Sequence, residues 1–89
     1  MKFVTVCGCG LGTCLLLKMT AQNALKQLGV ETEVIHSDLG SATSIDCDLF
    51  IITTDMENYF KAANKKYIAI KNVADVNEMK QKLEPHVKL

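Results

Sequence analysis

Short apolar runs alternate with longer amphipathic stretches along the chain. Residues 3–6 are all β-branched or aromatic, which predicts a buried strand. Residues 12–28 place apolar side chains at helical spacing among polar ones, which predicts an amphipathic helix. Gly29 follows where a left-handed residue would end that helix. We expect the leucines and the methionine of the helix to belong to the core, namely Leu15, Leu16, Leu17, Met19, Leu25 and Leu28.

Three further apolar runs predict strands. Residues 30–36 alternate apolar and polar side chains, residues 48–54 form a compact run that we expect to be buried on both faces, and residues 66–70 form the last run. Strands that alternate with helices over short connections favour a parallel sheet with right-handed crossovers. The predicted fold class is therefore α/β: one small three-layer domain over residues 1–89, whose four-stranded parallel sheet is flanked by helices.

The segments between these strands carry weaker patterns. Residues 37–45 contain three serines with Asp38, Gly40 and Thr43, which predicts a loop or a loose turn. A short helical turn after the third strand would have Thr54 or Asp55 as its N-cap. A last helix is expected from Asp75 onwards, with Pro85 weakening its final turn.

Charge and hydropathy narrow the choice of partners. The ten basic residues equal the ten acidic residues, so nothing predicts nucleic acid or an acidic membrane surface as a partner. No apolar run approaches the roughly 18 residues that cross a bilayer. The first residues also lack the pattern of a secretory signal, and we expect a cytoplasmic protein.

The candidate chemistry lies between the first strand and the first helix, in Cys7-Gly8-Cys9-Gly10-Leu11-Gly12-Thr13-Cys14. Three of the four cysteines fall here. Without a secretion signal, such clustering is more typical of catalysis or metal binding than of structural disulfides. In a parallel sheet this segment lies at the carboxyl edge beside the first strand, where ligands bind. Its backbone N–H groups and the positive end of the helix dipole favour an anion.

A thiol that opens such a loop is suited to phosphoryl transfer. A helix N-terminus lowers the pKa of a thiol from about 8.5, which would increase the thiolate fraction at Cys7. The same N–H groups would stabilise the three oxygens of a phosphoryl group. The glycines permit close approach of the backbone, and Thr13 offers a hydroxyl donor or a helix cap.

Other loop motifs fit less well. A Walker loop ends in Gly-Lys-Ser/Thr, whereas this segment lacks the lysine, and the dinucleotide fingerprint needs its third glycine where Thr13 stands. The tyrosine-phosphatase loop has an arginine six residues after its cysteine, and this chain contains no arginine. Hydrolysis should therefore be slow, which favours a phosphocysteine that persists until an acceptor arrives. No second cysteine pair is present, and we predict no metal site.

The first strand, the cysteine loop and the Leu-Leu-Lys-Met start of the helix resemble the IIB components of the sugar phosphotransferase system, above all the ascorbate type and next the galactitol type. The resemblance covers essentially the whole chain and implies a Rossmann-like domain with a phosphatase-like loop. It implies that Cys7 carries the phosphate, that residues 8–13 cradle it, and that Cys14 stands where such loops often have serine. By the same resemblance, Cys7 receives phosphate from a phosphohistidine on a IIA protein and passes it to a sugar emerging from a membrane IIC transporter. No metal or organic cofactor is implied.

Two other functions stay open at this point. A low-molecular-weight cysteine phosphatase is disfavoured by the missing arginine. A redox or anion-sensing module could use the cysteine cluster, for example through a disulfide between Cys7 and Cys14. Stable phosphate labelling indicates a carrier, turnover indicates a phosphatase, and a sensor shows neither. We predict that Cys47 is a small apolar residue before a core strand.

Polar residues near the ends of the second and third strands could border the cysteine loop. They are His36, Asp38, Ser41, Ser44, Thr53, Thr54 and Asp55. For the histidine, a place in an ordinary polar turn is the simpler interpretation.

Overall fold

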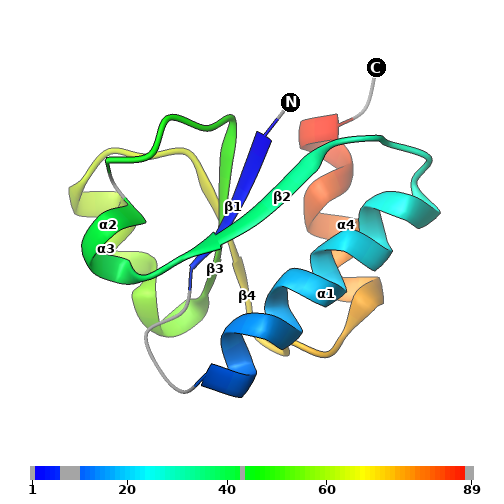
Figure 1. Ribbon diagram of the computed structural model, residues 1–89, viewed down its shortest axis with the longest axis horizontal. Coiled ribbons are helices and arrows are strands. Elements are labelled where there is room, and N and C mark those ends of the chain that lie inside the picture. The colour runs from blue at the N-terminus through cyan, green and yellow to red at the C-terminus, as the bar shows by residue number, and fades with distance from the viewer. Residues whose placement is uncertain (1, 7–10, 43, 88–89) are drawn as a thin grey trace.

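The computed structural model describes residues 2–6, 11–42 and 44–87. They form a four-stranded parallel sheet in the order β2-β1-β3-β4, with helices on both faces (Figure 1). The strands are β1 (Lys2–Val6), β2 (Glu33–Ser37), β3 (Leu49–Thr53) and β4 (Tyr67–Ile70). The helices are α1 (Leu11–Gln27), α2 (Leu39–Ala42), α3 (Glu57–Ala62) and α4 (Val76–Val87), and a 3-10 turn, η1 (Thr54–Met56), precedes α3. The predicted α/β architecture is confirmed.

Two apolar layers hold the helices to the sheet. Helices α1 and α4 cover one face, and α2 and α3 cover the other (Figure 1). Successive residues of a strand point to opposite faces, so Phe3 packs in the first layer and Val4 in the second. In β3, Leu49 to Ile52 are all buried, which confirms the expectation for this strand.

The order of the strands creates a switch point beside β1. The chain passes from β1 to β2 on one side and then returns to β3 on the other. Val6, the last residue of β1, pairs with Ser37 of β2 and with Ile52 of β3. In open parallel sheets the crevice outside such a carboxyl end is where ligands bind.

Helix α1 ends as predicted, and the hydrogen bonds at its C-terminus extend to residue 30, so that the second strand begins later in the sequence than expected. Gly29 has a φ of +75°, and its N–H donates to the carbonyl of Lys26 at 3.1 Å. The N–H of Val30 donates to the carbonyl of Leu25 at 3.0 Å. Because Val30 still closes the helix, β2 begins at Glu33 and not at residue 30 as the sequence predicted.

A single helical turn, α2, replaces part of the predicted loop. The Asp38 carboxylate accepts the N–H of Ser41 at 2.8 Å, and the N–H of Ala42 donates to the carbonyl of Asp38 at 3.1 Å. Ala42 is fully buried and anchors the turn on the sheet. A turn this short has too few positions to show helical periodicity, so the prediction of a loop or a loose turn did not specify the helical turn at residues 39–42.

Buried side chains hold the helical segment after β3 on the sheet, and the residues at its two N-cap positions contribute no side-chain cap. Thr53 precedes η1 and Met56 precedes α3, and neither makes a side-chain cap hydrogen bond. The prediction of Thr54 or Asp55 as the N-cap is therefore wrong. Met56 and Phe60 are buried in the second layer and fix the segment there.

Helix α4 continues through Pro85 to Val87. A proline lacks the N–H that a helix interior needs, but here the loss falls close to the helix end. Val87 is buried in the same layer as Met79 and Leu83, and this burial supports the last turn. The expected weakening therefore does not end the helix at Pro85.

Candidate functional site

The cysteine segment, residues 7–14, joins β1 to α1 at the carboxyl edge of the sheet. Outside the described residues lie Cys7, Gly8, Cys9 and Gly10. The first turn of α1 contains Leu11, Gly12, Thr13 and Cys14. The two ends of the segment are positioned by a fully buried Val6 and by the start of a 17-residue helix.

The neighbouring strands end beside this segment. Val6 pairs with Ser37 and Ile52, so the residues that follow these two partners flank the carboxyl end of β1. His36 pairs with Thr5 and is exposed on the edge strand β2. The parallel topology thus brings the ends of β2 and β3 to either side of the carboxyl end of β1, after which the cysteine segment begins.

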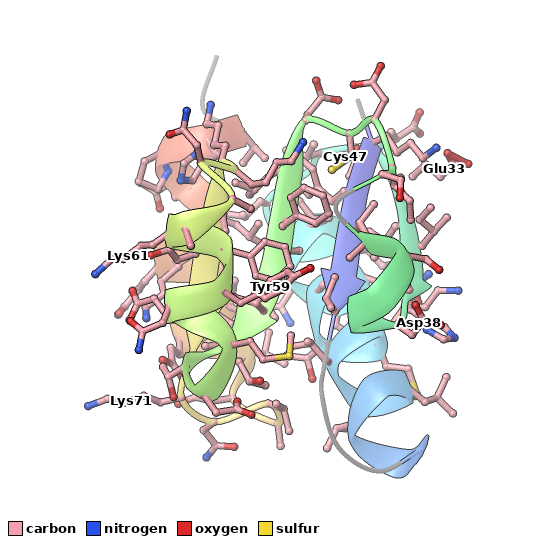
Figure 2. The ribbon with its side chains drawn as sticks, turned by 90° about the vertical axis from the view of Figure 1, so that its left-hand side faces the viewer. Glu33, Asp38, Cys47, Tyr59, Lys61 and Lys71 are labelled. Carbon is pink, nitrogen blue, oxygen red and sulfur yellow. The ribbon has the colours of Figure 1, made fainter. Side chains whose placement is uncertain are left out.

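The polar residues at the end of β2 and directly after it make hydrogen bonds within the turn that contains α2. The Ser37 hydroxyl donates to the carbonyl of Asp38 at 3.1 Å, and the Asp38 carboxylate caps α2 (Figure 2). Thr53, the last residue of β3, is half-buried, and Thr54, which follows it, is exposed. We therefore assign Asp38 to the structure of the α2 turn.

The outward face of α1 is apolar where the helix leaves the cysteine segment. The exposed fraction is 56% for Leu15, 39% for Leu16 and 50% for Met19, so the prediction that these three belong to the core is wrong. Consecutive residues project about 100° apart around a helix, and three leucines in a row cannot all face the sheet. Of that run, Leu17 is the one that is fully buried.

A second strand-to-helix connection leaves the same edge, between β4 and α4. The Glu78 carboxylate accepts the backbone N–H groups of Lys71 and Asn72, each at 3.0 Å. The Asn72 side chain accepts the N–H of Ala74 at 3.0 Å, and Asp75 accepts the N–H of Glu78 at 3.1 Å. Side chains of the connection and of the first turn of α4 thus satisfy four backbone donors.

The sequence predicts an exit turn at Lys71-Asn72 and a helix from Asp75, but these hydrogen bonds were not predicted, although one signal for them was present. Asp75 followed three residues later by Glu78 matches the capping-box pattern that starts a helix. The link to α1 had no such signal: the hydroxyl of buried Thr20 donates to the carbonyl of Val73 at 2.6 Å, across 53 residues of sequence. Only the tertiary fold brings that pair together.

Electrostatics favours the charged form of Glu78. Partial burial alone would raise the pKa of this carboxyl group, whereas the hydrogen bonds from the N–H groups of Lys71 and Asn72 lower it. The Lys82 ammonium, 3.6 Å from the carboxylate, acts in the same direction. The pKa of Glu78 is therefore lowered from its ordinary value.

Cys47 lies near the opposite, amino edge of the sheet (Figure 2). Its Sγ atom is 3.6 Å from the carbonyl oxygen of Leu49. Burial raises the pKa of the Cys47 thiol, and the carboxylates of Asp46 and Asp48 also raise it. The thiol is therefore protonated at neutral pH, which agrees with the predicted role as a small apolar residue.

Two surface cavities also lie towards the amino edge. One of about 490 Å³ lies between the end of α1 and the start of β2, and its lining includes Gln22, Lys26, Gly29 and Glu31. The other, of about 270 Å³, is lined in part by Asp46, Cys47, Lys65 and Lys66. Neither cavity includes a residue from the carboxyl end of a strand, so neither forms part of the cysteine site.

Two features are missing from the part of the chain that the structure describes. Residues 2–6, 11–42 and 44–87 contain no group of three or more histidine, cysteine, aspartate or glutamate side chains that could hold a metal ion. Within the same residues, no helix has the length and apolar character needed to cross a membrane.

Comparison with known proteins identifies the family and supports the fold. Residues 2–85 match the family model described as PTS system, Lactose/Cellobiose specific IIB subunit. The ascorbate-specific PTS system EIIB component of Mycoplasma pneumoniae is 28% identical over 86 residues, covering 93% of this chain and 90% of that protein. A solved structure, the lactose-specific IIB component domain of the phosphoenolpyruvate:carbohydrate phosphotransferase system from Streptococcus pneumoniae, has a TM-score of 0.72 and 16% identity. That match covers 99% of this chain and 98% of the other, and it concerns the fold.

Proposed function

The chain belongs to the family of IIB components of sugar phosphotransferase systems, and on that premise we propose that it carries a phosphoryl group on Cys7. The position of this residue carries the proposal. Cys7 directly follows Val6, which ends β1 at the switch point of the sheet, and α1 begins a few residues later. A thiol at that position would meet the positive end of the α1 dipole and the N–H groups of the first turn.

The composition of the cysteine segment supports an external anion as its ligand. Residues 7–14 contain no carboxylate and no amide side chain, and the hydroxyl of Thr13 is their one side-chain oxygen. In the β4–α4 connection, Glu78 accepts backbone N–H groups with its carboxylate. We assign the corresponding role in the first connection to the phosphoryl oxygens, held by the backbone of residues 8–14 and by the Thr13 hydroxyl.

The proposed reaction consists of two transfers. First, the Cys7 thiolate attacks the phosphorus of a phosphohistidine on a IIA protein; the P–N bond breaks, an S–P bond forms, and the imidazole keeps the electron pair. Second, a sugar hydroxyl presented by a membrane IIC transporter attacks the same phosphorus. The S–P bond breaks, an O–P bond forms, the hydroxyl proton leaves to a base or to water, and the thiolate is regenerated. A thiolate of low pKa is both a nucleophile and a leaving group, and the proposal needs no metal or organic cofactor in this chain.

We propose an ascorbate-type substrate for the transporter that this chain serves. The support is the curated relative, whose name specifies ascorbate and which is 28% identical to this chain. Both transfers would take place in the cytoplasm, because the carrier must meet its donor and its transporter on the same side of the membrane. Reconstitution with matched IIA and IIC proteins tests the substrate: we expect phosphorylated ascorbate and no phosphorylated lactose or cellobiose. The opposite pattern of products would contradict the ascorbate assignment.

The first experiment is phosphorylation of the purified chain, followed by its intact mass. The chain is incubated with phosphoenolpyruvate, the general phosphotransferase proteins and a matched IIA protein. We expect one phosphate on the wild type and none on Cys7→Ser, because a serine hydroxyl is not ionised at neutral pH. The matched control is Cys47→Ser, which removes a thiol at the opposite edge and should be phosphorylated like the wild type.

Three other results would contradict the proposal in different ways. Phosphate on Cys7→Ser would place the acceptor on another residue. Steady release of product from an aryl phosphate, without a stable label, would indicate the phosphatase. If an active donor produced no stable label and the aryl phosphate was not turned over, the remaining function would be the redox or anion-sensing module.

A further inference from the structure

An apolar patch on α1 borders the cysteine segment. We define the α1 patch as Leu15, Leu16 and Met19, which lie on one strip of the helix that faces away from the sheet. At a rise of 1.5 Å per residue, Leu15 and Met19 lie about 6 and 12 Å along the axis from Leu11, where α1 begins. Of the four large apolar side chains that are exposed among the described residues, three belong to this patch.

The α1 patch serves no purpose in the core. The opposite side of the helix packs on the sheet through Leu17, Ala21, Ala24 and Leu25, each no more than 2% exposed. Further along the outward strip the exposed residues become polar, with Gln22, Asn23 and Lys26. Among residues 15–27, whose side chains the structure describes, the exposed apolar surface of α1 is therefore confined to residues 15–19. Clustered exposed apolar side chains of this kind mark interaction surfaces, whereas single ones need no explanation.

The size and charge of the surface favour a transient, anionic protein partner. A stable interface buries about 800 Å² on each partner, which is far more than three partly exposed side chains provide. Helix α1 contains Lys18 and Lys26 and no acidic residue, and its N-terminus is the positive end of the helix dipole. Negative charge beside an apolar surface on the partner would complement both features.

We propose that the α1 patch docks the protein that donates the phosphoryl group; this inference rests on the proposed function of Cys7. Transfer requires the phosphorus to come within about 3–3.5 Å of the thiolate, so the surface of the donor must cover the region around the start of α1. A donor that carries a phosphohistidine is anionic there and is attracted to the positive end of α1. After transfer, the phosphoryl group on Cys7 neutralises part of that charge, which weakens the contact and releases the donor. The membrane acceptor meets the chain only in this second state and gains no such attraction.

The test is the rate of phosphorylation at increasing concentrations of the phosphorylated IIA donor. Leu15→Glu and Met19→Glu place a negative charge in the patch without touching the core. We expect the KM for the donor to rise by roughly tenfold in each variant, while the maximal rate stays within about twofold of the wild type. The matched control is Asn23→Glu, which adds the same charge on the polar part of the same helix and should leave the KM within about twofold. Circular dichroism and thermal unfolding establish that all three variants are folded.

The outcomes separate this inference from the function on which it rests. A wild type that takes up no phosphate on Cys7 would overturn both. A phosphorylated wild type with an unchanged donor KM in the two patch variants would overturn the docking surface and leave the function standing. Normal uptake from the donor with slow transfer to the transporter would assign the patch to the acceptor, against the proposal. A wild type that sediments as a dimer, with both patch variants monomeric, would assign it to a second copy of the chain and likewise overturn the donor contact.

Discussion

The β4–α4 and β1–α1 connections both leave the carboxyl edge of the sheet. They differ in whether their own side chains include acceptors for the backbone N–H groups. In the β4–α4 connection, the side chains of Asn72, Asp75 and Glu78 accept four such groups. In the β1–α1 connection, residues 7–14 offer neither a carboxylate nor an amide. The β4–α4 connection thus satisfies these backbone N–H groups with its own side chains, and these hydrogen bonds stabilise the fold. We interpret the β1–α1 connection as one in which a bound anion accepts the hydrogen bonds of the backbone N–H groups.

The largest effect is expected from giving the first connection a carboxylate of its own. In Cys9→Asp, the new charge would compete with the phosphoryl oxygens for the backbone N–H groups and would repel them. We expect phosphorylation of Cys7 by the IIA donor to slow by at least about tenfold, while thermal stability is unchanged or higher. Stopped reactions analysed by intact mass give the rate, and calorimetry gives the melting temperature.

The neutral variant Cys9→Asn controls for the change of side-chain shape. It should be phosphorylated within about threefold of the wild-type rate, because it adds no charge. Equal rates for Cys9→Asp and the wild type would show that the first connection does not bind the phosphoryl group through its backbone, and the comparison of the two connections would then fail.

A second prediction concerns the link between the connections. Thr20 stands on α1, and its buried hydroxyl donates to the carbonyl of Val73 in the β4–α4 connection. Thr20→Val keeps the shape of the side chain but leaves that carbonyl without its donor, which costs about 1–2 kcal/mol. For a chain of this length, each kcal/mol lowers the melting temperature by roughly 4–8 °C. Chemical and thermal unfolding measure the loss.

The control for this link is Thr54→Val, which makes the same exchange at an exposed position and should change stability by less than about 0.5 kcal/mol. Phosphorylation of Cys7 should be the same in Thr20→Val and in the wild type. If Thr20→Val also slowed phosphorylation, the two connections would not be independent, and the β4–α4 connection would contribute to the function of the cysteine segment.

Most of the fold could be predicted because its elements carry long, regular patterns. The apolar run of β3 and the helical spacing of α1 each extend over a whole element, and Gly29 marks the end of α1 by its positive φ. The single turn α2 and the starts of η1 and α3 are too short or too dependent on packing to leave such a pattern. Local sequence therefore predicted the layers better than the turns that join them.

For the candidate site, too, features with a local sequence pattern could be predicted, whereas features that depend on tertiary packing could not. The end of β1 at Val6, directly before Cys7 in the sequence, follows from the strand pattern and from the parallel topology. The exposure of Leu15 and Leu16 could not be predicted from the sequence. Three adjacent leucines project in different directions around a helix, and only the position of α1 on the sheet decides which of them is buried. The pairing of Thr20 with Val73 depends on residues 53 apart and has no local signature.

The smallest effect is expected at Glu78, and it should depend on pH. Because the pKa of Glu78 is lowered in the folded chain, its charge stabilises the fold fully above the ordinary pKa of 4.5, and this contribution is lost as the pH falls through the folded value. At pH 7, Glu78→Gln should lose less than about 1 kcal/mol, since the carboxylate is partly exposed to solvent. Urea unfolding from pH 7 to 3 should show this difference shrinking below pH 4.5, whereas Glu84→Gln, at an exposed position of α4, should show none at pH 7. A difference that stayed constant down to pH 3 would mean that shape and not charge holds the β4–α4 connection, and the analogy between this carboxylate and a bound phosphoryl group would lose its physical basis.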